Sequence, residues 1–119
     1  DDKMVMRNIA LIPGIKYLIL IVPANKWLMN KIDYNLGHYR RYSKNNLINM
    51  FELINFKMCK IFTFNKVGVI GWFVQGMLGN SLGKNNIMVY NKLIPLIKKL
   101  DHVLPFNGLS LIAVGVIND

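Results

Sequence analysis

The sequence has little cysteine, little negative charge and no long uninterrupted apolar run. Its single cysteine, Cys59, excludes an internal disulfide and any metal site built from several cysteines. Because its neighbours Met58 and Ile61 are apolar, we expect Cys59 to be a small core residue. His102 has no partner at metal-ligand spacing, so no metal site is predicted. This thiol usage fits a reducing, cytoplasmic compartment.

Acidic residues number only 6 against 15 Lys and Arg, which gives a formal net charge of +9. A dense positive charge favours contact with phosphates of nucleic acids or anionic membranes. The basic residues are scattered, however, and only Arg40-Arg41 and Lys98-Lys99 are adjacent. This scatter favours an ordinary solvated surface and disfavours a nucleic-acid ligand. A small basic, non-enzymatic module that binds an anionic membrane surface or RNA is the alternative function.

No apolar run reaches the length needed to cross a bilayer: Ile15–Val22 is short, and Val67–Leu78 is interrupted by glycines and a glutamine. The second segment is apolar all round, so a buried helix, a loose hairpin and a membrane-dipping patch all remain open for it. Burial is the preferred interpretation; the membrane alternative is a peripheral contact through Trp72, Phe73, Met77 and Leu78.

The order of elements predicts one α/β domain over residues 1–119. A first helix, with Val5, Ile9 and Ile12 at helical spacing, should end in a type II turn at Pro13-Gly14. Lys16–Val22 is almost continuously apolar, which is typical of a strand covered on both faces inside a parallel sheet.

Further along, Ser43 is the expected N-cap of a helix that Asn55 closes in the left-handed conformation. Later segments comprise strands at about 57–64 and 109–117, a loop at Asn80–Asn86 and a helix at Ile87–Leu104 that Pro95 should kink or start. In the strand at 57–64, even-numbered residues from Met58 onward are expected on one side.

Pro23–Tyr42 lacks periodicity and begins where a strand ends, a position at which α/β sheets bind ligands. His38 is the first catalytic candidate, as a base or a substrate-orienting group. The alternative is a structural role, in which a histidine beside the start of a helix only forms hydrogen bonds with the backbone. Arg40 and Arg41 are candidates for binding a carboxylate or phosphate through paired hydrogen bonds, the fork arrangement that arginine favours. The alternative is that one of them is exposed and the other packs against an aromatic residue.

Aromatic residues in the same segment can wall a substrate pocket or pin the loop to the core. Asp33 can orient His38 or pair with Arg40, and an ordinary surface ion pair is the favoured interpretation. The aromatic candidates are Trp27, Tyr34, Tyr39 and Tyr42.

Three segments together resemble the later half of class I S-adenosylmethionine-dependent methyltransferases of the type-11 and type-23 groups. They are Pro13-Gly14 followed by Tyr17–Pro23, the run Gly37–Ser43, and Leu109–Gly115 after a helix ending at Asn55-Phe56. The order and spacing of these segments carry the resemblance, which covers nearly the whole chain. Three departures are Ile15 after the turn, Asn46 where a capping Glu is common, and Asn55 for a glycine.

The resemblance implies a Rossmann-like, seven-stranded sheet in which Lys16–Val22 is the fifth strand and 57–64 the sixth. The seventh, 109–117, would lie between them. The family's glycine-rich S-adenosylmethionine loop has no counterpart here and would precede Asp1. We therefore expect the C-terminal half of a cytoplasmic methyltransferase acting on a small-molecule or lipid-like acceptor, with no cofactor-binding residues of its own and no activity alone.

Overall fold

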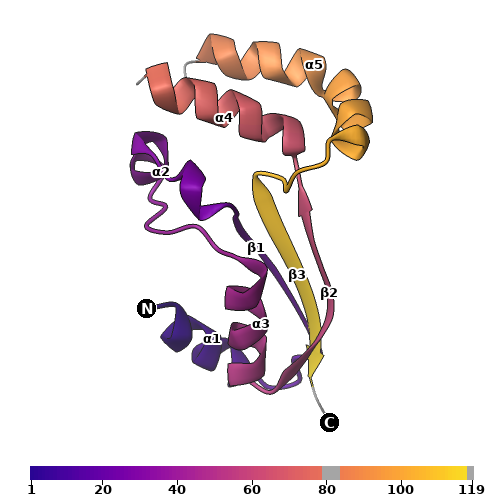
Figure 1. The fold of residues 1–119 in the computed structure, drawn as a ribbon. Helices are drawn as coiled ribbons and strands as arrows, with labels where there is room; N and C mark the ends of the chain where they lie inside the picture. The colour runs from indigo at the N-terminus through magenta and orange to yellow at the C-terminus, as the bar shows by residue number, and fades with distance from the viewer. Residues whose placement is uncertain (79–83, 118–119) are drawn as a thin grey trace.

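The computed structural model describes residues 1–78 and 84–117, and shows a mixed α/β arrangement built on one three-stranded antiparallel sheet (Figure 1). Its elements are, in chain order, α1 (Asp2–Ala10), β1 (Tyr17–Pro23), the 3₁₀ turn η1 (Lys26–Leu28), α2 (Lys31–Asn35), α3 (Lys44–Leu53), β2 (Phe56–Phe64), α4 (Lys66–Leu78), α5 (Lys84–Val103) and β3 (Ser110–Ile117).

The strand order is β1-β3-β2, and β3 runs antiparallel to both neighbours. The three predicted strands are therefore confirmed to within two residues at each end, and so is the position of the last strand between the other two. The prediction that the first strand is covered on both faces in a parallel sheet is wrong for the described residues. Its direct neighbour is antiparallel, and alternate side chains of β1 are exposed.

One face of the sheet carries the core. Phe51 and Leu47 of α3 are fully buried there, against Leu111 and Ala113 of β3. A Cβ placed on Gly115 would lie 2.4 Å from the Phe51 ring, so the absence of a side chain lets α3 approach the sheet closely. From α1, Met6 completes this core. The predicted inward stripe of α1 was centred wrongly, since Val5 is exposed.

The opposite face has no helix across it in Figure 1. We call it the open sheet face, and its exposed members are Tyr17, Ile19, Ile21, Phe62 and Phe64. Ile19 and Ile21 are 62% and 64% exposed, which is unusual for isoleucines in the middle of a strand. The apolar run of β1 thus supplies a core on one side and an uncovered surface on the other.

A bulge in β2 explains two wrong expectations. The pairing shifts between Met58 and Lys60, which stand opposite consecutive residues of β3. An extra residue at this point reverses the alternation, so Met58 and Ile61 both face the core. Cys59 sits in the bulge and is exposed, contrary to the prediction of a core residue.

The predicted turns and caps are mostly confirmed. Gly14 has φ +75, and Ile15 donates to the Ile12 carbonyl at 3.4 Å, as the Pro-Gly turn requires. Asn55 closes α3 with φ 57. The capping box at Ser43 is complete, not weakened, because the Asn46 amide oxygen accepts from the Ser43 backbone N–H at 3.0 Å in place of a Glu carboxylate.

The segment between β2 and β3 forms two helices that lie beside each other, beyond the end of the sheet at which β1 ends (Figure 1). Residues 67–78, whose structure the sequence left open, are helical within α4. The expected loop at 80–86 lies partly outside the described residues, and its last three residues belong to α5. Pro95 lies inside α5 and does not start it, and Figure 1 shows α5 changing direction along its length.

Candidate functional site

The segment after β1 is held by short local structures that the sequence did not predict. Asn25 takes φ 62, which turns the chain into η1, and Asn30 caps α2 with a complete capping box. The N3 residue of that box is Asp33, whose Oδ2 accepts from the Asn30 backbone N–H at 3.1 Å. The cap therefore fixes the position of the Asp33 carboxylate beside the end of β1.

Asp33 is fully buried and forms a bidentate ion pair with Arg41. Arg41 Nη2 lies 2.9 Å from Asp33 Oδ1, and Arg41 Nε lies 3.0 Å from Asp33 Oδ2. A third donor, Arg41 Nη1, reaches the Ala24 carbonyl at 2.8 Å. The prediction of a surface ion pair was wrong in both its place and its partner: Asp33 pairs in the interior with Arg41, not with Arg40.

His38 is the third member of this cluster. Its Nδ1 lies 3.3 Å from Asp33 Oδ1, and its backbone N–H donates to the Asp33 carbonyl at 2.8 Å. Because a carboxylate only accepts hydrogen bonds, this contact selects the tautomer with the proton on Nδ1 and leaves Nε2 as an acceptor. Asp33, which is buried, orients the ring through Nδ1. The His38 side chain is 39% exposed, so part of the ring remains accessible to a ligand.

A cavity of about 220 Å³ lies over this cluster, at the end of β1. Trp72 of α4 forms one side, with its ring 5.0 Å from the Arg41 guanidinium carbon. The indole Nε1 of Trp72 is buried and has no hydrogen-bond partner in the part of the chain that the structure describes. The lining residues include Val22, Pro23, Leu36, His38, Trp72 and Ser110.

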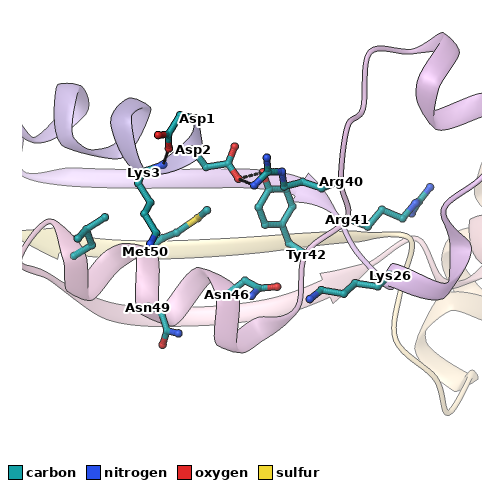
Figure 2. Close-up of a pocket in the computed structure, with 11 residues that line it drawn as sticks. Asp1, Asp2, Lys3, Lys26, Arg40, Arg41, Tyr42, Asn46, Asn49 and Met50 are labelled. Carbon is teal, nitrogen blue, oxygen red and sulfur yellow. Dashed lines mark hydrogen bonds and ion pairs between the residues drawn. The ribbon is translucent and has the colours of Figure 1, made fainter.

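Arg40 belongs to a separate cluster. Figure 2 shows Arg40 and Tyr42 both directed at Asp2, while Arg41 extends the other way. Arg40 Nη1 lies 3.0 Å from Asp2 Oδ2, and the Tyr42 hydroxyl donates to the same oxygen at 2.7 Å. Burial, followed by the hydrogen bond to Asp2 and its charge, raises the pKa of Tyr42 to about 12, against a smaller opposing effect of Arg40.

This second cluster borders an open cavity of about 530 Å³ between α1, α3 and the loop (Figure 2). Lys3 and Lys26 also line it, together with the amide side chains Asn46 and Asn49. Both predicted fork arginines line this cavity, but they differ in burial: Arg40 is exposed, and Arg41 is buried in its ion pair with Asp33.

The predicted aromatic residues do not surround one pocket. Tyr34 and Tyr39 are 63% and 84% exposed. Trp27 and Tyr42 border a third cavity of about 400 Å³, which shares no lining residue with the His38 cavity. The aromatic residue that does face His38 is Trp72, which the sequence placed in an apolar patch and not at the site. The indole N–H of Trp72, in an apolar helix whose single charged residue is Lys66, was the signal that could have singled it out.

No known protein family matches this chain, and it has no similar curated protein and no similar solved structure. Among the described residues, no group of His, Cys, Asp and Glu is placed to hold a metal ion. None of the described helices combines the length and the apolar character needed to cross a bilayer.

Proposed function

We propose that this chain is the acceptor-binding, C-terminal part of an S-adenosylmethionine-dependent methyltransferase, and that His38 is its general base. The observation that carries the proposal is the position of His38, oriented by Asp33, beside a cavity at the carboxyl end of β1. Ligands of α/β sheets bind beyond that end of the strands.

The topology supports the same proposal. The order β1-β3-β2, with an antiparallel middle strand, agrees with the order that the family resemblance implies for its last three strands. The open sheet face and the outer edge of β1 offer apolar and backbone surface to the remaining strands and helices of such a domain. The acceptor would be a small molecule or a lipid-like molecule.

In this proposal, the residues of this chain contact the methyl acceptor and not the cofactor. S-adenosylmethionine would supply an activated methyl group, and no segment of the chain fits its glycine-rich loop, so we assign no step or contact to the cofactor here. His38 Nε2 takes the proton of the acceptor hydroxyl or amine, while Asp33 stabilises the imidazolium that forms. The Trp72 ring would form one side of the space that the acceptor occupies.

Two measurements test the proposal. The coding sequence upstream of Asp1 should encode a glycine-rich turn after an apolar strand; any other kind of sequence there contradicts it. Isothermal calorimetry should detect negligible S-adenosylmethionine binding to the 119-residue chain, and micromolar binding would refute the assignment of the cofactor to other residues.

In a polypeptide that also carries the proposed cofactor half, His38→Gln should lower the rate of labelled-methyl transfer by roughly 10² to 10⁴. Tyr39→Phe, a change at an exposed side chain of the same loop, is the control and should leave the rate unchanged. An unaltered rate in His38→Gln would exclude His38 as the base.

A further inference from the structure

The outward side of α4 is apolar where a water-exposed helix is normally polar. Its exposed residues are Ile70, Phe73, Val74 and Met77, at the i, i+3, i+4, i+7 spacing of a single stripe. Trp72 points the other way, toward Arg41. The stripe is thus a surface distinct from the His38 cavity, and from the open sheet face on the strands.

Trp27 extends this stripe beyond α4. Its ring centroid lies 6.0 Å from that of Phe73, and the Trp27 side chain is 65% exposed. Tryptophan and phenylalanine beside aliphatic side chains are the residues that proteins place at the boundary between lipid headgroups and acyl chains. We refer to Trp27, Ile70, Phe73, Val74 and Met77 as the α4 stripe.

Apart from Asp101, the charged residues of α4 and α5 are all lysines. α4 carries no charged residue after Lys66, and the lysines of α5 at 92, 98 and 99 are exposed. The sole acidic residue of the two helices is Asp101, whose Oδ1 is directed inward and accepts from the Val67 backbone N–H at 2.9 Å. Asp101 is half-buried beside the start of α4, and no fully exposed acidic residue accompanies these lysines on the described part of the two helices.

We propose that the α4–α5 hairpin is a peripheral docking element for an anionic lipid bilayer, with the α4 stripe entering the headgroup region and the α5 lysines contacting lipid phosphates. Charge complementarity selects the occupant, because a protein interface core is depleted in lysine whereas an anionic bilayer attracts each one. None of the described helices can span the bilayer, so the contact lies at its surface. This inference does not depend on the methyltransferase proposal.

The test uses the 119-residue chain and two kinds of vesicle, one of phosphatidylcholine and one of equal parts phosphatidylcholine and phosphatidylglycerol. Cosedimentation should show binding to the anionic vesicles that weakens with added salt, and tryptophan emission should shift to shorter wavelength. Phe73→Glu/Met77→Glu should lower the partition coefficient by about tenfold or more, and Lys92→Glu/Lys99→Glu by a similar factor.

The matched control is Ile19→Glu/Ile21→Glu, which places the same charges on the open sheet face and should leave vesicle binding unchanged. Circular dichroism and a melting curve confirm that each variant is folded. Equal binding by the stripe variants and the parent chain would overturn the proposal, as would equal binding to both vesicle types. If the parent chain self-associates but does not bind vesicles, and the stripe variants lose this self-association, the stripe is a protein contact. If the parent chain binds single-stranded RNA but not vesicles, the lysines bind nucleic acid.

Discussion

At the scale of single residues, Asp33 and Arg41 form the contact with the largest electrostatic consequence in the described chain. Both are buried, and each satisfies the charge of the other through two short hydrogen bonds. Taking two charges out of water is costly, so such a pair adds little net stability. Breaking it by removing one partner is different, because the remaining charge stays buried without compensation.

Arg41→Gln should therefore destabilise the chain by about 3–5 kcal/mol, whereas Arg40→Gln should cost less than about 1 kcal/mol. The two arginines are adjacent and both pair with aspartate, but Arg40 is 59% exposed and Arg41 is 1% exposed, measured on the side chains. Urea denaturation of the two variants gives the comparison. Equal losses would mean that the Asp33 site admits water.

Tyr42 gives a pH-dependent prediction at the same scale. Its pKa is raised to about 12, and burial is the largest cause. A raised pKa favours the protonated, folded form, so this contribution is complete below pH about 10 and is lost as the pH rises toward about 12.

Spectrophotometric titration should find a late-ionising phenol that disappears in Tyr42→Phe. In Asp2→Asn its pKa should fall but stay above that of an ordinary tyrosine, because the burial remains. A full return to the ordinary value would show that Asp2, not burial, is the main cause.

At the scale of elements, the contact between α3 and β3 depends on a residue with no side chain. A Cβ on Gly115 would lie 2.4 Å from the Phe51 ring and 3.0 Å from the Lys57 carbonyl oxygen. Gly115→Ala should therefore destabilise the chain by about 1–3 kcal/mol.

The matched control for that change is Gly71→Ala in α4, where an added Cβ meets nothing within 4 Å. This substitution should stabilise the chain by up to about 1 kcal/mol through helix propensity. Thermal unfolding of the two variants should move the midpoint in opposite directions. A loss of stability in both would indicate that α4 is packed more tightly than its exposed stripe suggests.

The elements themselves were largely predictable because their signals are local. Pro13-Gly14, Ser43 and Asn55 each mark a boundary by their own conformational preferences, and all three boundaries are found. The bulge at Cys59 was not predictable, since a bulge is set by pairing with β3 and leaves no local mark. The alternation read from β2 failed for that reason.

The candidate site was predictable in part. His38 was identified from its chemistry in an irregular segment, but its partner depends on contacts across the fold. The Asn30 cap places Asp33 in the interior, and Trp72 arrives from a helix more than thirty residues later. Such long-range contacts determine which of Arg40 and Arg41 is buried, and neighbouring identical residues cannot be distinguished by sequence pattern alone.

At the scale of the whole molecule, the sheet is stabilised from one side. Leu20 points to the core and the two isoleucines beside it, Ile19 and Ile21, point to the open sheet face. An exposed apolar surface of this kind is characteristic of an interface or of a domain that continues elsewhere. Comparing a substitution on the core side of β1 with one on its open side therefore tests whether further chain covers the open sheet face.

In the 119-residue chain, Leu20→Ala should cost about 2 kcal/mol or more, and Ile19→Ala less than about 1 kcal/mol. In a polypeptide that carries the proposed cofactor half, the cost of Ile19→Ala should rise to match that of Leu20→Ala, because the same side chain becomes buried. Urea denaturation of both variants in both lengths of chain gives the four values. If Ile19→Ala is already costly at 119 residues and its cost depends on protein concentration, the open sheet face is covered by a second copy of this chain, and the methyltransferase proposal loses its support from that face.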